Sequence, residues 1–215
     1  MNAEPDGRLA LPEELLLLSL HPETGRKLCR TRFLQYGVAG AVLAELALGG
    51  HVAEERGRLV IADPMPPADP LLAAVLAGLS GKGAKGPRTR TWVRQAGRHM
   101  EERWLKRLIG RGALRMETRR FLGVVPYHRY PAAGAGHTAP ARQRLDEALR
   151  AGFPDPRSRA LAALVAAIDV HNRLYPGLRA RGLRRTLRRL VRVEWPAHAV
   201  YDNVRRDKAS ESSGG

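Results

Sequence analysis

The sequence predicts a mainly α-helical protein that folds as a single globular helical bundle, with surrounding amphipathic helices and one or two β-hairpins. The chain has 215 residues and is 44% apolar, which suffices for one domain with a substantial core. Aromatic residues make up only 5%, so the core must consist mainly of leucine, alanine and valine. Leucine and alanine favour helices, and the apolar positions recur at helical spacing between glycine and proline stops.

The first elements follow from local signals. A helix is predicted over residues 12–20, because Pro12 suits the first helical turn and acidic residues follow it. A second helix is predicted over 30–48, closed by a pair of glycines. A hairpin is predicted over 51–61, where Glu55-Arg56-Gly57 separates two short extended runs.

The rest of the chain predicts more helices and a second hairpin. This hairpin is expected over 113–126, turning around 117–120, and a loop is expected over 131–140. The helices are expected over residues 71–79, 91–109, 141–151, 156–174 and 182–193, with a last one starting near 196. Together these elements predict one helical domain over residues 11–205, between flexible tails at 1–10 and 206–215.

Two features that the sequence lacks bear on where in the cell the protein is expected. The N-terminus lacks a signal-peptide pattern, and no apolar stretch approaches the roughly 18 residues that span a bilayer. The single cysteine, Cys29, cannot form an internal disulfide. We therefore expect a cytoplasmic protein whose contact with a membrane is peripheral. Its bias toward arginine, alanine, glycine and proline is typical of a GC-rich bacterial genome.

The net charge of +16 points to anionic partners, namely nucleic acid, anionic lipid headgroups or an acidic protein. Most of the basic residues are arginine, whose guanidinium binds phosphate in a bidentate way. Over residues 183–192 arginines alternate with leucines, so that one helix face is apolar and the other basic. The basic side consists of Arg184, Arg185, Arg188, Arg189 and Arg192. This pattern is typical both of a solvated outer face and of a surface for anionic lipid or phosphate.

The sequence does not assemble a catalytic or metal site. Gly81-x-Gly83-x-x-Gly86 matches the letters of the dinucleotide fingerprint, but it follows a predicted helix, whereas the fingerprint requires a preceding strand. No two histidines have zincin spacing, and Asp169 and His171 would not share a helix face. We therefore expect no enzymatic activity and no cofactor.

Three motifs resemble the Golgi phosphoprotein 3 family. They are Leu11-Pro-Glu-Glu-Leu-Leu-Leu-Leu-Ser-Leu20, Gly37-x-x-Gly-x-x-Leu-x-Glu-Leu-Ala-Leu48 and Leu105-x-x-Leu-x-x-x-Gly-x-Leu114. The likeness covers roughly residues 11–200. It implies a mainly helical fold, binding of phosphatidylinositol 4-phosphate, and a protruding β-hairpin used in membrane contact and self-association. It also raises the hypothesis of an adaptor that carries a protein client.

The resemblance further implies where a lipid headgroup would bind. The family pocket uses a Trp and an Arg near the second helix and two basic residues on the long helix. An ungapped comparison places these four positions at Arg30, Ala39, Arg98 and Glu101, of which only Arg98 matches. The resulting candidate headgroup-binding set is Arg98, Arg30, Arg94, Arg26 and Lys27.

The candidate membrane-contacting hairpin combines cations with apolar residues, at Arg119, Arg120, Phe121 and Leu122. Such a tip could insert into the interfacial region of a bilayer, or pack on the core or on another subunit. Our leading hypothesis is a peripheral membrane protein that binds anionic phospholipid headgroups, with self-association through the 113–126 hairpin. The alternative is a nucleic-acid-binding protein with winged-helix-like helix–hairpin units, although few aromatics are available for base stacking.

Overall fold

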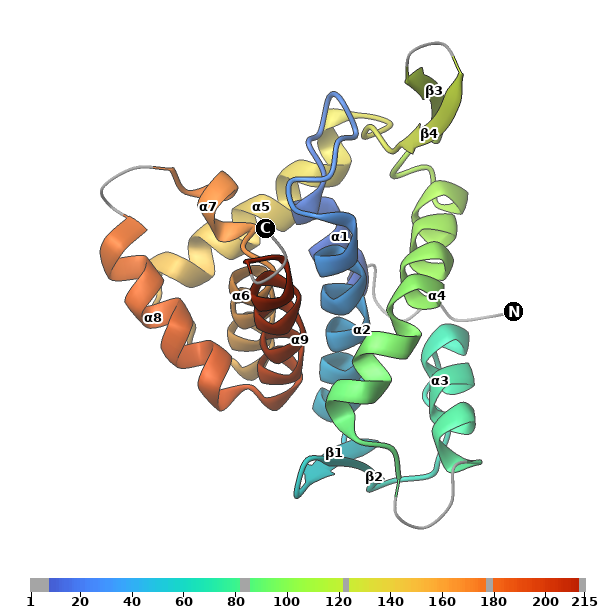
Figure 1. Cartoon of the computed structure of the whole chain (residues 1–215), viewed down its shortest axis with the longest axis vertical. Coiled ribbons are helices and arrows are strands. Elements are labelled where there is room, and N and C mark those ends of the chain that lie inside the picture. Colours follow the sequence, from blue (N-terminus) through green and yellow to red (C-terminus); the bar gives the residue numbers. More distant parts are fainter. Residues whose placement is uncertain (1–7, 82–85, 122–123, 177–179, 213–215) are drawn as a thin grey trace.

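The structure is a computed structural model that describes residues 8–81, 86–121, 124–176 and 180–212 (Figure 1). Its helices are α1 Leu11–Ser19, α2 Thr31–Leu48, α3 Pro70–Ser80, α4 Thr89–Gly110, α5 Ala135–Arg150, α6 Pro156–Ala167, α7 His171–Leu174, α8 Ala180–Val193 and α9 Trp195–Ser212. Its antiparallel hairpins are β1 Val52–Glu55 with β2 Arg58–Ile61, and β3 Glu117–Phe121 with β4 Val125–Arg129. The predicted mainly α class with β-hairpins is confirmed.

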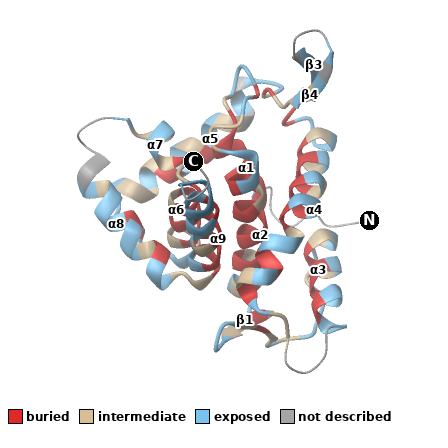
Figure 2. Ribbon diagram, viewed as in Figure 1, coloured by how far each residue is buried: buried red, intermediate tan, exposed pale blue. Residues whose placement is uncertain are grey.

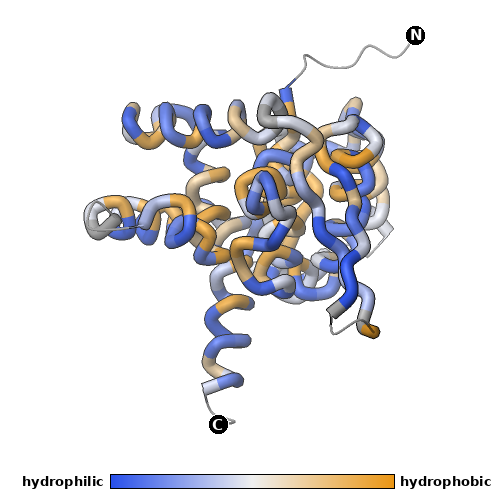
Figure 3. The backbone as a smooth tube through the Cα atoms, turned by 90° about the horizontal axis from the view of Figure 1, so that it is seen from above, coloured by the Kyte–Doolittle hydropathy of each residue, from blue (hydrophilic) through white to orange (hydrophobic). Residues whose placement is uncertain are grey.

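Helix α2 is the centre of the fold and packs against α1, α4, α6 and α9 (Figure 1). It is buried on nearly every side from Phe33 to Leu46, as expected for a helix that is apolar all round (Figure 2). Close approach requires glycine at one crossing, because a Cβ on Gly40 would lie 2.3 Å from Cγ2 of Val200 in α9. Hydrophobic segments gather inside the molecule, whereas the end of α9 projects from it (Figure 3).

Helix α1 brings two carboxylates into the core, and arginines neutralise them. Glu13 is fully buried, and its Oε1 lies 2.8 Å from Nη1 of Arg111 and 3.4 Å from Nε of Arg107. Glu14 is paired in the same way with Arg144, whose Nη2 lies 2.7 Å from its Oε1. A buried carboxylate needs such partners, so these arginines serve the fold and are not free surface charges.

The second hairpin lies later in the chain than predicted. Its strands pair Glu117 with Arg129 and Phe121 with Val125, so the chain reverses between 121 and 125 and not around 117–120. The charged residues at 117–120 suggested a turn. They suit these strands because both faces of a projecting two-stranded hairpin are open to water.

Three helix boundaries also differ from the prediction. Helix α5 begins at Ala135 and runs through the exposed Pro140, within the predicted loop. The helix predicted over 156–174 is divided into α6 and α7, because Asp169 has a φ of 63°, outside the right-handed helical region. Helix α9 extends to Ser212, past residue 206 where a flexible tail was predicted.

Before its projecting last turn, α9 is held by polar contacts with α2 and with the segment between α6 and α7. The carboxylate of Asp207 accepts a hydrogen bond of 3.0 Å from the hydroxyl of Tyr36, and Nε of Arg32 lies 3.1 Å from the same oxygen. Lys208 pairs with Asp169. Across the described residues, we find no helix that combines the length and apolarity needed to cross a membrane.

Candidate functional site

The loop between α1 and α2 covers the foot of the β3–β4 hairpin. The carbonyl of Gly25 accepts a hydrogen bond of 3.2 Å from the backbone N–H of Tyr130, and that of Pro22 accepts one of 2.8 Å from Ala132. Gly25 has a φ of 61°, and a Cβ there would lie 2.3 Å from the Tyr130 nitrogen. Only glycine fits this position, so the loop is held against the hairpin.

The same loop is also joined to α4. Nζ of Lys27 lies 2.5 Å from Oε1 of Glu101, whose side chain is 5% exposed. One turn earlier, a Cβ on Gly97 would lie 2.8 Å from the carbonyl oxygen of Gln35, so α4 crosses closely over the start of α2. Burial raises the pKa of the Tyr130 hydroxyl, and the carboxylates of Glu101 and Glu102 raise it further. The hairpin foot, the loop and the middle of α4 therefore form one continuous region.

This region holds most of the predicted headgroup-binding residues, but several are neutralised. Lys27 is paired with Glu101, and Nε of Arg98 lies 3.3 Å from Oε1 of Glu102. Arg98 nevertheless stays 83% exposed. Arg26 and Arg94 are exposed and form no ion pair with the residues that the structure describes.

Arg30 is directed elsewhere. Its guanidinium pairs with Glu211 at the end of α9 and lies 5.4 Å from the centre of the Phe33 ring. Ala39, which aligns with the second cationic position of the family pocket, is fully buried in the core. The five predicted cations therefore do not converge on one headgroup pocket, because Arg30 faces α9 and a carboxylate holds Lys27.

The β3–β4 hairpin extends past the end of α4 and away from the helical body (Figure 1). Arg119 and Arg120 are exposed, and Nη2 of Arg119 lies 2.9 Å from Oε2 of Glu117 in its own strand. Phe121 lies in β3, opposite Val125, but its side chain is not described, and Leu122 lies outside the described residues. The placement favours a projecting hairpin over one that packs on the core.

Sequence reasoning missed the exposed apolar residue of this tip. Val124 is 79% exposed, the largest value among the exposed large hydrophobic side chains of the described residues. At the hairpin base Met116 is 56% exposed. The sequence does place a β-branched residue, Val124, directly after Gly123. Because the turn was predicted at 117–120, Val124 was not recognised as part of the hairpin tip. Val124 and the exposed Arg119 and Arg120 thus lie together at the tip, while the predicted apolar roles of Phe121 and Leu122 stay predictions.

Two features of the described residues bear on metal binding and on the reactivity of the cysteine. No three histidine, cysteine, aspartate or glutamate side chains there come together as a metal-binding group. Cys29 is half-buried, and its desolvation raises the pKa of the thiol to about 12, so the thiol keeps its proton near neutral pH.

The comparisons with known proteins agree with the architecture. A family model described as Golgi phosphoprotein 3 (GPP34) matches residues 11–206, from the first residue of α1 into α9. No curated protein matches the chain.

Proposed function

We propose that this chain, which belongs to the Golgi phosphoprotein 3 family, is a peripheral membrane protein that binds anionic phospholipid headgroups. One observation carries the proposal. The exposed cations of α4 and of the loop before α2 lie around the foot of a hairpin that extends cations and Val124 outward. A bilayer that contacts the hairpin tip would thus meet Arg119 and Arg120 beside its apolar anchor, Val124.

Surface charge and one apolar contact can supply the free energy of membrane binding without a specific headgroup pocket. A basic residue near an anionic membrane contributes about 1 kcal/mol. Arg26, Arg94 and Arg120 form no ion pair with the other described residues, and Arg98 and Arg119 are exposed although paired. Each of these cations that reaches the bilayer would contribute about 1 kcal/mol, and burial of Val124 would add about 1–2 kcal/mol.

Phosphatidylinositol 4-phosphate is the ligand that the family resemblance suggests, but we propose recognition by charge. Ala39 is buried, and Glu101 places a carboxylate where the family pocket has a cation. The proposal includes a cytoplasmic location, and the family resemblance adds self-association through the hairpin and an adaptor role with a protein client.

Co-sedimentation with vesicles tests the proposal. We compare phosphatidylcholine vesicles with vesicles that also carry phosphatidylserine or phosphatidylinositol 4-phosphate at matched charge. The variant Arg119→Ser/Arg120→Ser should lose most binding to both anionic types. A matched variant, Arg150→Ser/Arg206→Ser, removes the same charge from exposed positions on α5 and α9 and should bind like the wild type. The proposal fails if both variants bind equally, or if the protein ignores anionic vesicles but binds duplex DNA with sequence preference.

A further inference from the structure

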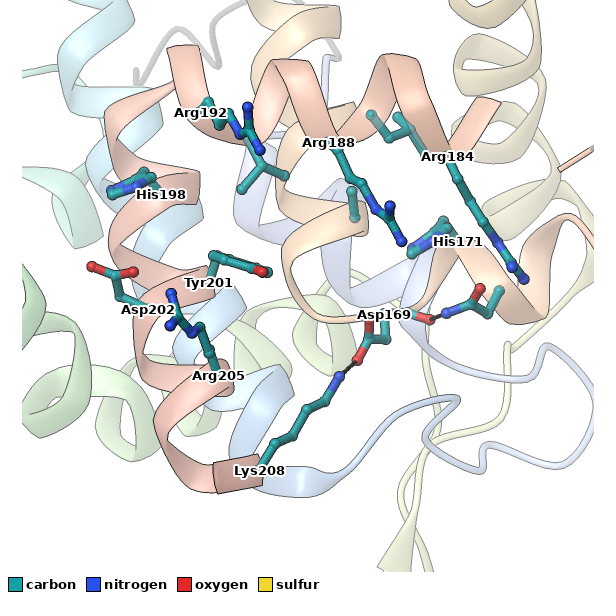
Figure 4. Close-up of a pocket in the computed structure, with 14 residues that line it drawn as sticks. Asp169, His171, Arg184, Arg188, Arg192, His198, Tyr201, Asp202, Arg205 and Lys208 are labelled. Carbon is teal, nitrogen blue, oxygen red and sulfur yellow. Dashed lines mark hydrogen bonds and ion pairs between the residues drawn. The ribbon is translucent and has the colours of Figure 1, made fainter. Parts of the chain in front are cut away.

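A basic hollow lies between α8 and α9, and none of the predicted headgroup residues lines it, although Lys208 at its edge shares the Phe33 ring with Arg30 (Figure 4). Its volume is about 550 Å³, and α7 and the end of α6 form its floor. Ligand pockets for small molecules commonly have about 300–1,000 Å³. The hollow is therefore large enough for a small organic ligand.

Helix α8 supplies one wall, and its orientation is fixed by packing. Leu187 and Val191 are buried, 3% and 5% exposed, on the side of α8 that faces α6. Residues four apart share a helix face, so Arg184, Arg188 and Arg192 form a stripe along the hollow. Figure 4 shows Arg184 and Arg188 extending from α8 toward His171 on the floor. Because its apolar side is packed against α6, α8 cannot turn about its axis to move these arginines out of the hollow.

Helix α9 supplies the opposite wall with Arg205 and Lys208, together with His198, Tyr201 and Asp202. Five cations and two carboxylates line the hollow, which leaves three positive charges with neutral histidines. One of the carboxylates, Asp169, is already paired with Lys208.

The remaining cations lack partners. The guanidinium groups of Arg184, Arg188, Arg192 and Arg205 form no ion pair or hydrogen bond with another described residue. This differs from Arg107, Arg111 and Arg144, each of which reaches a buried glutamate. Four guanidiniums therefore share one concave site with Asp202, and this excess of positive charge favours a bound anion.

We propose that this hollow binds a compact phosphomonoester with a hydroxyl-bearing body, such as a sugar or polyol phosphate. Guanidinium groups bind phosphate oxygens in a bidentate way, and Arg184 and Arg188 lie on adjacent turns to do so. The carboxylate of Asp202 can accept hydrogen bonds from ligand hydroxyls, and the half-exposed ring of Tyr201 offers a surface against which the body packs. This site goes beyond the proposed membrane contact, since none of its lining residues belongs to the hairpin region.

On the floor of the hollow, His171 can add a hydrogen bond to a bound phosphate. Burial lowers the pKa of His171, and although Asp169 opposes this effect, Arg184 and Arg188 lower the pKa further. The imidazole is therefore neutral near pH 7 and can donate one hydrogen bond to a phosphate oxygen. The same phosphate could belong to a free metabolite or to a lipid headgroup, and separate arms of the test distinguish these sources.

Titration calorimetry of the full chain at fixed ionic strength tests the site, with glucose 6-phosphate and glycerol 3-phosphate as soluble probes. The variant Arg184→Gln/Arg188→Gln should weaken binding at least about tenfold, because charge-assisted hydrogen bonds to phosphate are lost. The control Arg185→Gln/Arg189→Gln removes the same charge from the same helix, at exposed positions that do not line the hollow, and should stay within about twofold. All four side chains are exposed, so thermal unfolding should confirm that both variants fold.

A second arm uses vesicles that carry phosphatidylinositol 4-phosphate or phosphatidylserine. If the hollow takes a lipid headgroup, Arg184→Gln/Arg188→Gln loses preference for the phosphomonoester lipid. If it takes a free metabolite, the variant binds both vesicles like the wild type but loses the soluble probes. The inference is overturned if neither soluble probe nor phosphomonoester lipid binds, if both arginine pairs matter equally, or if duplex DNA displaces the probes from the wild type. None of these outcomes depends on Arg119 and Arg120. The proposed phosphate site can therefore be refuted while the proposed membrane contact through the hairpin still holds.

Discussion

Nζ of Lys27 lies 2.5 Å from Oε1 of Glu101, and this pair joins the loop before α2 to the middle of α4. The side chain of Glu101 is 5% exposed, whereas that of Lys27 is 21% exposed. The lysine thus neutralises a nearly buried carboxylate at a position where the family resemblance implies a ligand-binding cation. This internal pair is the clearest structural departure from the headgroup pocket that the resemblance suggested.

Replacing the carboxylate should therefore strengthen membrane contact. In Glu101→Gln the charge of Lys27 is no longer neutralised, and one free cation near an anionic bilayer contributes about 1 kcal/mol, or about fivefold in affinity. Co-sedimentation with phosphatidylserine vesicles would measure the gain. Glu23→Gln, which removes an exposed carboxylate from the same loop, is the control. Equal binding by Glu101→Gln and the wild type would show that Lys27 does not reach the membrane.

Val124 should act as the apolar anchor of the hairpin. Its side chain is 79% exposed, so Val124→Asp should change the free energy of unfolding by less than about 0.5 kcal/mol. Binding to anionic vesicles should nevertheless fall, because the substitution removes apolar contact and adds a repelled charge. Val193→Asp, at a position 67% exposed at the end of α8, provides the matched control. A similar loss in both variants would indicate general repulsion without an anchor.

Glu13 should be a major determinant of stability. Its fully buried carboxylate joins α1 to α4 through Arg107 and Arg111. Breaking a buried ion pair costs about 3–5 kcal/mol, so Glu13→Ala should lower the midpoint of urea unfolding strongly. Glu55→Ala, at an exposed position of β1, should change stability by less than about 0.5 kcal/mol. A small effect at Glu13 would contradict the structural role assigned to these arginines.

Cys29 provides a prediction about pH. Burial raises the pKa of its thiol from an ordinary 9.0 to about 12, so the folded state retains a proton that the unfolded state releases above pH 9. Stability should then fall with rising pH between about 9 and 12, by about 1.4 kcal/mol per pH unit from this group. Comparing urea unfolding of the wild type and Cys29→Ala over this range isolates the contribution. Parallel pH profiles for the two proteins would refute the assignment.

Elements with local signals could be predicted from the sequence. The glycine pair after α2 and the Glu55-Arg56-Gly57 turn are both signals within a few residues, and the structure has α2 and the β1–β2 hairpin there. The amphipathic pattern of α8 was also readable, because the apolar side of a helix recurs every three to four residues.

Features that depend on distant contacts could not be predicted. Asp169 interrupts a helix pattern, and its partner is Lys208 in α9. Arg111 pairs with Glu13, which lies 98 residues earlier, and no local pattern in the sequence indicates this contact. The hollow beside α8 exists only because α9 folds back along it, so the sequence revealed the arginine stripe without its opposite wall.

Flotation of the wild-type protein with vesicles at low salt tests the central claim most directly. We expect the protein to float with phosphatidylcholine vesicles that contain phosphatidylserine and to remain in the lower fraction with vesicles of phosphatidylcholine alone. Added salt should release the protein from the anionic vesicles, because it screens the surface charges. A protein that does not float with anionic vesicles at low salt would contradict the claim that this family member is a peripheral membrane protein.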